Sequence, residues 1–351
     1  MKYFATYASG FREIVVKYLS ETISDAQIKQ VFDGAILFST QKCFSDMHLR
    51  CFNNIFQVLD TMKLPDIEND QVERHLSKLI NKFPYHEMGS YHANKRKKSF
   101  RIVTLSRSCL ISVNKTKKIK LEQLIKKQTG LEVKRDKADI EFWIIYRNEG
   151  VSLFLKRLTT HKTYSKILKK GALHPEIAFM LVWISHPQKN SIVLDPFCGT
   201  GSIAIQCAKY FKSKMIYSCD NDNDKIIDLV NYLKKSEHKG ISNKIICTNA
   251  DFTKLESMFD KESVDIIITD PPWGLYNESE YKENDVNDLY NEFMKIFATI
   301  LKQNATLVIL TACKRLMKDI IKESKIFSIK NEYQVLISGK QSGIFVINKI
   351  G

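Results

Sequence analysis

Residues 192–211 read IVLDPFCGTGSIAIQCAKYF, and this stretch decides the fold. An apolar run ends in Asp195, Gly199 and Gly201 follow, and a helical pattern starts at Ser202. The glycines allow a tight turn and a close approach of the backbone to a ligand, while a helix N-terminus presents free N–H groups to a carboxylate or phosphate. The stretch therefore predicts a buried strand, a ligand-binding turn (residues 195–201, the glycine turn) and a helix.

The pattern of an apolar strand that ends in an aspartate occurs four times in the C-terminal half. Alternating strands and helices predict an α/β fold with a doubly wound, mostly parallel, Rossmann-like sheet that binds ligands at the carboxyl ends of its strands. A closing hairpin completes the predicted sheet. The predicted strands are residues 192–195, 215–220, 244–251, 266–270, 305–311, 326–337 and 343–350, and the predicted helices are residues 202–211, 223–235 and 286–302.

The glycine turn by itself is compatible with two kinds of cofactor. Gly199, Gly201 and Ala204 also fit the dinucleotide pattern G-x-G-x-x-A. Asp195, however, stands directly before the glycines, where its charge disfavours a pyrophosphate and favours a cationic sulfonium or an amino-acid ammonium. We therefore expect S-adenosyl-L-methionine, with NAD(P) as the alternative.

Aspartates at the ends of the next two strands suit other parts of that cofactor. Asp220 can accept hydrogen bonds from both ribose hydroxyls, although Asp222 is a rival and a solvated turn aspartate is the alternative. Asp251 suits the exocyclic amine of adenine, and the ring or main chain of Phe252 suits the purine. The predicted cofactor-binding residues are Asp195, Pro196, Cys198, Gly199, Thr200, Gly201, Asp220, Asn221, Asp251 and Phe252.

The fourth strand leads into Asp270, Pro271, Pro272 and Trp273, the predicted catalytic residues (the proline turn). An exocyclic amine on a base is a poor nucleophile because its lone pair is delocalised into the ring. Asp270 and the Pro271 carbonyl can accept the amine protons, which localises the lone pair, while Trp273 stacks on the base. The base must be unpaired or flipped to reach such a site. The alternative is a strand-ending turn with a tryptophan in the core.

The excess positive charge lies in one segment. The chain of 351 residues has a net charge of +15, and its segments carry −1 (residues 1–81), +16 (residues 82–170) and 0 (residues 171–351). Such a concentration is typical of a polyanion-binding module, whereas a merely Lys-rich surface would spread the excess more evenly.

The composition excludes several other classes. With 44% hydrophobic and 26% charged residues the chain is globular in composition. No apolar run approaches the ~20 residues of a membrane span, and residues 1–7 lack the apolar stretch of a signal peptide. The eight cysteines have no CxxC pair, so we expect reduced thiols in a cytoplasmic protein and no metal site.

The N-terminal half alternates strand and helix patterns. Residues 1–60 predict a small ferredoxin-like unit with a strand, a helix, a hairpin bent at Asp33-Gly34 and an amphipathic helix over residues 47–62. A basic unit follows. Its predicted helices are residues 72–83 and 121–128, and its predicted strands are residues 100–105, 140–147 and 151–158.

This order of pieces resembles the THUMP-domain class I RNA methyltransferases, which make N2-methylguanosine in tRNA. The resemblance rests on D-P-F-C-G-T-G at residues 195–201, D-P-P-W at residues 270–273, the segment at residues 171–178 and the overall layout. It implies that Asp195, Gly199, Gly201, Asp220 and Asp251 hold the cofactor and that residues 270–273 hold the guanine amine. It also implies that the THUMP unit grips the acceptor end of tRNA.

Two features depart from the pattern of that family. Trp273 stands where the family usually has Tyr or Phe, and the segment at residues 278–288 is acidic although it lies close to a predicted RNA site. D-P-P-W is also similar to the turn of the adenosine-N6 methyltransferases of mRNA, but there the turn precedes the cofactor loop.

We therefore expect an S-adenosylmethionine-dependent enzyme that methylates guanine N2 in tRNA, bound through the basic segment 82–170, with a monomer as the default. The alternatives are an adenine-N6 or ribosomal-RNA guanine-N2 methyltransferase, a non-catalytic RNA-binding protein and an NAD-dependent oxidoreductase. The expected domains are a ferredoxin-like domain (residues 1–62), a THUMP domain (63–158), a linker (159–170) and a methyltransferase domain (171–351).

Overall fold

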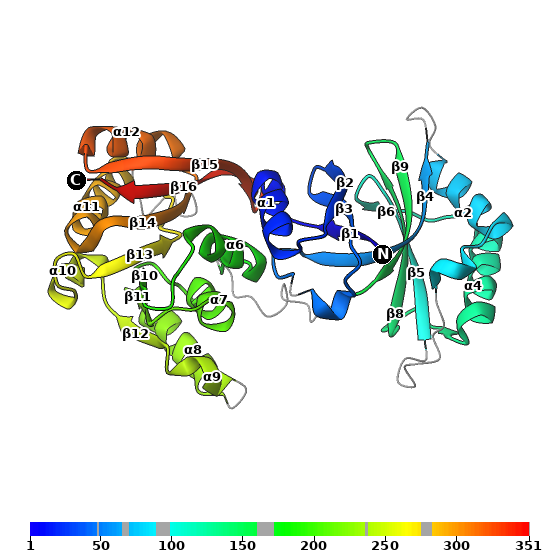
Figure 1. Cartoon of the computed structure of the whole chain (residues 1–351), viewed down its shortest axis with the longest axis horizontal. Helices are drawn as coiled ribbons and strands as arrows, with labels where there is room; N and C mark the ends of the chain where they lie inside the picture. Colours follow the sequence, from blue (N-terminus) through cyan, green and yellow to red (C-terminus); the bar gives the residue numbers. More distant parts are fainter. Residues whose placement is uncertain are drawn as a thin grey trace. The chain divides into compact units, whose positions relative to one another are not determined.

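The structure is a computed structural model of the chain, in which two compact units are present (Figure 1). The N-terminal unit comprises Met1–Tyr7 and Tyr18–Lys162, and the C-terminal unit comprises Ala8–Lys17 and Thr163–Gly351. The structure describes residues 1–47, 49–64, 70–88, 99–159, 172–235, 238–274 and 283–350. The basic run at residues 91–98, the Lys-rich connector at residues 161–170 and part of the acidic segment lie outside these ranges.

The N-terminal unit is built on one nine-stranded sheet with the order β2-β3-β1-β4-β9-β8-β5-β6, in which β7 also pairs with β5. Helices α2 and α4 cover one face of this sheet (Figure 1). The strands are β1 (Lys2–Thr6), β2 (Gln27–Phe32), β3 (Ala35–Ser39), β4 (Asn54–Lys63), β5 (Ser99–Ser106), β6 (Cys109–Leu110), β7 (Glu132–Val133), β8 (Ile140–Arg147) and β9 (Val151–Arg157), and the helices are α2 (Gln71–Asn81), α3 (Tyr85–Met88) and α4 (Lys115–Thr129). Helix α1 (Arg12–Thr22) is divided between the two units after Lys17.

The helix predicted over residues 47–62 is wrong, because most of this segment forms the central strand β4. Phe56 belongs to the core on one face of the sheet and Leu59 to the core on the other, so the strand is buried on both sides. A bulge between Val58 and Asp60 further breaks the alternation of buried and exposed side chains. Because this strand is buried on both faces and contains a bulge, its apolar residues are spaced like those of an amphipathic helix. Pairing of β4 with β9 also joins the predicted ferredoxin-like and THUMP segments in one sheet.

The C-terminal unit contains a seven-stranded sheet with the order β12-β11-β10-β13-β14-β16-β15. The first five strands are parallel, and β16 and β15 close the sheet as an antiparallel hairpin. This confirms the predicted doubly wound, mostly parallel fold. The strands are β10 (Ile192–Asp195), β11 (Met215–Asp220), β12 (Ile245–Asn249), β13 (Val264–Thr269), β14 (Leu301–Thr311), β15 (Phe327–Ile337) and β16 (Lys340–Lys349).

Helices cover both faces of this sheet, with α6, α7 and α8 on one side and α10, α11 and α12 on the other (Figure 1). The central strands are therefore buried on both faces, which explains their continuous apolar runs. The helices are α6 (Pro175–Ser185), α7 (Ser202–Tyr210), α8 (Asn223–Leu233), α9 (Lys239–Ser242), α10 (Leu255–Met258), α11 (Glu283–Ile300) and α12 (Lys314–Ser324). Within the described part of the chain, no helix combines the length and apolar content that crossing a membrane requires.

The strand order reverses between β10 and β13. From β10 the chain moves outward through β11 to β12, and it then returns to form β13 on the other side of β10. Val193 pairs with Ile266 and Leu194 with Ile267, so the carboxyl ends of these two strands lie side by side. In open α/β sheets a ligand binds at such a reversal. The glycine turn and the proline turn both start here.

Candidate active site

The glycine turn needs its two glycines for different reasons. Both have positive φ, +53° at Gly199 and +81° at Gly201. A Cβ added to Gly201 would lie 2.4 Å from Leu229 Cδ1 of α8, so this glycine allows close packing within the protein. A Cβ added to Gly199 would meet nothing within 4 Å. The backbone at Gly199 therefore borders open space that a ligand can approach.

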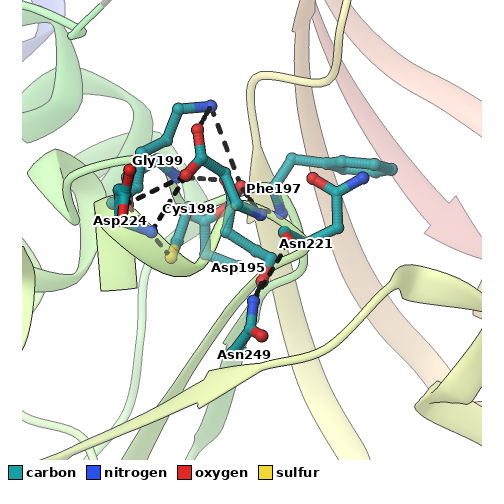
Figure 2. A network of polar contacts seen from close by, with 10 residues as sticks. Asp195, Phe197, Cys198, Gly199, Asn221, Asp224 and Asn249 are labelled. Carbon is teal, nitrogen blue, oxygen red and sulfur yellow. Dashed lines mark hydrogen bonds and ion pairs between the residues drawn. The ribbon is translucent and has the colours of Figure 1, made fainter. Parts of the chain in front are cut away.

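Asp220, at the end of β11, holds the glycine turn in place. Figure 2 shows Gly199 and Asn249 within this network of polar contacts. Asp220 Oδ2 accepts a hydrogen bond from the Gly199 N–H at 2.7 Å, and its Oδ1 accepts one from the Asp222 N–H at 3.0 Å. Asn249, at the end of β12, donates from Nδ2 to the Asp220 carbonyl at 3.0 Å. The ends of three neighbouring strands are thus connected by hydrogen bonds that meet at Asp220.

Asp195 is a buried carboxyl group with one oxygen occupied and one not. It is 1% exposed, and its Oδ1 accepts a hydrogen bond from Thr269 Oγ1 on β13 at 3.0 Å. Among the described residues, its Oδ2 is buried without a hydrogen-bond partner. Burial raises the pKa of Asp195 well above its ordinary value, and the charges of Asp220 and Asp270 add to this effect. Within the described ranges, no cation or donor reaches Oδ2 to stabilise the ionised form.

Asp270, directly after the neighbouring strand β13, also has a carboxyl oxygen without a described partner. Its Oδ1 is buried and has no hydrogen-bond partner in the described part of the chain. Burial raises the pKa of Asp270 to about 7, although the indole of Trp273 acts in the opposite direction. A buried acceptor without a partner costs about 1–3 kcal/mol. Two such acceptors at one sheet edge are suited to receiving N–H donors or a cation from a ligand.

Trp273 does not present its ring for stacking. The residue is 6% exposed, and its Nε1 donates to the Leu310 carbonyl of β14 at 3.4 Å. A buried tryptophan gains from burying its large apolar ring while its N–H finds an acceptor. The predicted stacking role needs an exposed ring face, which this structure does not provide. Within the same turn, Pro271 is buried and Pro272 is exposed.

The adenine-binding candidates also have internal partners. Asp251 Oδ1 caps a short helix (Phe252–Lys254) by accepting from the Thr253 N–H at 3.0 Å. The ring of Phe252 packs 5.5 Å from that of Phe197 in the core. The ring of Phe252 is thus mainly a core group, and its main chain is the better candidate for contact with a purine. Of the remaining candidates, Pro196 and Cys198 are buried, Thr200 is half-buried and Asn221 is exposed.

Residues 162–342 match the family model described as RMKL-like, methyltransferase domain (UPF0020). The chain belongs to this methyltransferase-domain family. The match includes both the glycine turn and the proline turn.

Two tRNA guanine-N2 methyltransferases are similar in sequence to this chain. The tRNA (guanine(6)-N2)-methyltransferase of Methanocaldococcus jannaschii is 28% identical over 210 residues, which cover 50% of this chain and 53% of that protein. The tRNA (guanine(10)-N2)-dimethyltransferase of Methanothermobacter thermautotrophicus is 25% identical, with 60% and 62% covered. The chain therefore spans about half to three fifths of the length of these two relatives.

The fold is shared along the whole chain with a solved structure. The crystal structure of TrmN from Thermus thermophilus superposes with a TM-score of 0.78, at 19% identity, over 99% of each chain. At this identity the likeness shows the fold, which includes both sheets of the RMKL-like methyltransferase described above.

Sequence reasoning missed two polar residues of the site, Thr269 and Asn249. Thr269 is recognisable only as the last residue of an apolar strand, because its partner Asp195 lies 74 positions earlier. A hydroxyl inside an apolar run, directly before a candidate carboxylate, is the one sequence feature that points to it.

Proposed function

We propose that this chain is an S-adenosylmethionine-dependent methyltransferase that modifies the exocyclic N2 amine of a guanosine in tRNA. The observation that carries the proposal is the buried, partnerless Oδ1 of Asp270, on the strand adjacent to the one that ends in the glycine turn. An amine of a base supplies the N–H donor that this oxygen lacks. The family match and the activities of the two similar tRNA methyltransferases support the choice of reaction and substrate.

The residues around the glycine turn fit S-adenosylmethionine. The buried Oδ2 of Asp195 has no partner in the described structure, and the space beside Gly199 is open. Asp195 and the turn would hold the amino-acid part, Asp220 the ribose, and Asp251 with the main chain of Phe252 the adenine. When bound, the cofactor supplies a methyl group on a positively charged sulfur, which is the electrophile of the reaction.

Asp270 and the Pro271 carbonyl would orient the guanine amine and accept its protons. This removes the lone pair from conjugation with the ring and aims it at the electrophile. While the N–C bond replaces the methyl–sulfur bond of the donor, whose electron pair would stay on the sulfur as a neutral thioether, the amine would lose one proton to the Asp270 carboxylate, which would then release it to water. Such base assistance contributes roughly 10²–10⁴ in rate. With a pKa of about 7, Asp270 is able both to take up and to release this proton near neutral pH.

The basic segment would hold the RNA. Within its described part, α4 carries the sequence KTKKIKLEQLIKKQT, whose buried residues include Leu121 and Ile125. Most of its lysines are exposed or half-buried. A lysine-rich helix surface of this kind attracts the phosphate backbone and gives salt-dependent affinity. We propose a cytoplasmic location together with this tRNA substrate.

The test is methyl transfer from S-adenosyl-[methyl-³H]methionine to unmodified tRNA transcripts, followed by mass spectrometry of the nucleosides. We expect label in N2-methylguanosine. Label in N6-methyladenosine, or label in ribosomal RNA only, would replace the proposed substrate. Binding of NADH without binding of S-adenosylmethionine would refute the proposal altogether.

A further inference from the structure

A series of buried polar groups lies behind the proline turn, away from the glycine turn's own hydrogen bonds. The Tyr290 hydroxyl of α11 is 2.7 Å from Thr311 Oγ1, at the end of β14. Thr311 Oγ1 also accepts a hydrogen bond from the Cys313 N–H at 2.9 Å. Cys313 Sγ in turn donates to the Trp273 carbonyl at 3.4 Å. The series thus connects α11, through the end of β14, to the main chain of the proline turn.

The strand register explains why these groups meet. Thr269 of β13 pairs with Ile309 of β14, so β14 continues for two residues beyond the last residue of β13. Leu310 and Thr311 therefore extend alongside the proline turn. The Leu310 carbonyl accepts from the Trp273 indole, and Cys313 donates to the Trp273 carbonyl. The turn is held at its Trp273 end, while the Asp270 carboxyl at its other end has an oxygen without a described partner.

Tyr290 and Thr311 have no access to solvent. Both residues are 0% exposed. A buried hydroxyl that loses its partner cannot turn to water instead, so each of these two groups fixes the position of the other.

We propose that Tyr290, Thr311 and Cys313 are positioning residues, which fix the proline turn so that Asp270 and the Pro271 carbonyl meet the amine of the substrate base. This inference rests on the proposed methyltransferase function. Displacement of reacting groups by about 1 Å can cost roughly 10² in rate without loss of binding. The series acts on the rate of the chemical step and leaves the cofactor pocket, which lies at β10 and β11, unchanged.

The first experiment compares Tyr290→Phe with Phe297→Leu in single-turnover methyl transfer to unmodified tRNA transcripts. Phe297 is on the same helix and is 0% exposed in the same core, but its side chain is apolar. At saturating tRNA and S-adenosylmethionine we expect Tyr290→Phe to lower the rate constant about 10-fold, within the range that misplacement of a reacting group causes. The Kd of S-adenosylmethionine and the half-saturating tRNA concentration should stay within about 2-fold of wild type. Phe297→Leu should lower the melting temperature but not the rate.

The second experiment uses the Cys313 side chain. Cys313→Ala removes the donor to the Trp273 carbonyl, while Cys313→Ser keeps an O–H donor at the same position. We expect the alanine variant to lose rate and the serine variant to regain most of it. A wild-type rate in Tyr290→Phe overturns the inference. So does equal rate loss in Tyr290→Phe and Phe297→Leu, or in the two Cys313 variants. If wild type itself transfers no methyl group, the proposed function fails, and the positioning role falls with it.

Discussion

Half-buried carboxylates occur in both units, and their surroundings are opposite. In the N-terminal unit, Glu141 accepts hydrogen bonds from Arg101 Nε at 2.8 Å, Arg157 at 2.7 Å and the Trp143 indole at 3.0 Å. In the C-terminal unit, Asp270 has a buried oxygen with no partner among the described residues. Burial alone raises the pKa of both groups. At Glu141 the hydrogen bonds from Arg157 and Arg101 outweigh it and lower the pKa, whereas that of Asp270 stays at about 7.

This is the difference we expect between a structural carboxylate, Glu141, and the proposed functional one, Asp270. The ions around Glu141 neutralise it within the fold, so nothing remains for a ligand to supply. Asp270 is left in an unfavourable environment that only a bound donor corrects. Strongly perturbed groups of the second kind are typical of functional sites.

The largest effect on the rate of methyl transfer is expected from removing the carboxylate of Asp270. Asp270→Ala should lower the rate of methyl transfer by roughly 10²–10⁴, because the amine loses its proton acceptor. Isothermal titration should show that the affinity for S-adenosylmethionine is nearly unchanged. Glu141→Ala should leave the single-turnover rate at saturating tRNA unaffected. Equal loss of cofactor binding and transfer in Asp270→Ala would contradict the assigned role.

Replacing Asp270 by Asn and Glu141 by Gln should change the stability of the protein in opposite directions. The pKa of Asp270 is raised from 3.8 to about 7 by burial, so folding is favoured by the protonated form. The stability it contributes is complete below pH 3.8 and is lost as the pH rises through about 7. Asp270→Asn should therefore stabilise the protein at pH 8, by at most roughly 4 kcal/mol, and have little effect at pH 4.

Glu141→Gln should behave in the reverse way. The lowered pKa of Glu141 means that its contribution is present above pH 4.5 and is lost as the pH falls. Loss of charge-assisted hydrogen bonds should destabilise the protein by about 1.5–3 kcal/mol at pH 7. Thermal unfolding of both variants between pH 4 and pH 8 measures the two trends. Trends of the same sign would remove the contrast between the two carboxylates.

The rate of methyl transfer should follow the ionisation of Asp270. Only the carboxylate accepts the amine proton, so the rate should rise about tenfold per pH unit below pH 7 and level off above it. A single-turnover pH profile tests this. In Asp270→Asn the residual rate should lose this dependence.

The two glycines of the glycine turn also differ in role, because Gly201 borders a protein side chain and Gly199 borders open space. Gly201→Ala should destabilise the protein by about 1–3 kcal/mol, because a Cβ at φ +81° would overlap Leu229. Gly199→Ala should cost less stability, since its Cβ would meet no protein atom, but should weaken S-adenosylmethionine about tenfold by occupying the approach of the ligand. Unfolding and titration of both variants distinguish packing from ligand access.

The smallest effects are expected from lysine substitutions in the basic segment (residues 82–170), which should alter the affinity for tRNA. Replacement of Lys95, Lys97 and Lys98 by alanine should weaken tRNA binding and make its salt dependence shallower, by about 0.7–0.9 in the logarithmic slope for each phosphate group that the protein no longer neutralises. Filter binding between 50 and 200 mM salt measures this. An unchanged slope would place the RNA-binding residues elsewhere in the segment.

The sequence predicted the C-terminal fold well because its strands follow simple rules. Its parallel strands carry apolar runs, such as Ile192–Leu194 in β10 and Ile266–Ile268 in β13, and each of these runs ends where polar residues lead into a turn. It failed at β4, where burial on both faces and a bulge produced helical spacing. It could not predict that Trp273 faces inward, because a side chain that suits a base also suits a core. The partners of Asp195 and Tyr290 stayed hidden for a related reason, since hydrogen bonds across strands depend on register rather than on local pattern.

The hydrogen bond from Thr269 to Asp195 has one more consequence. It connects β10, which ends at the proposed binding site of the methyl donor, to β13, which ends at the proposed binding site of the acceptor base. Neighbouring strands of a sheet are about 4.8 Å apart, so the pitch of the sheet itself sets the distance between the two ligands. Both proposed ligand sites then lie at the carboxyl edge of one sheet within the C-terminal unit, so their alignment is a property of that sheet alone.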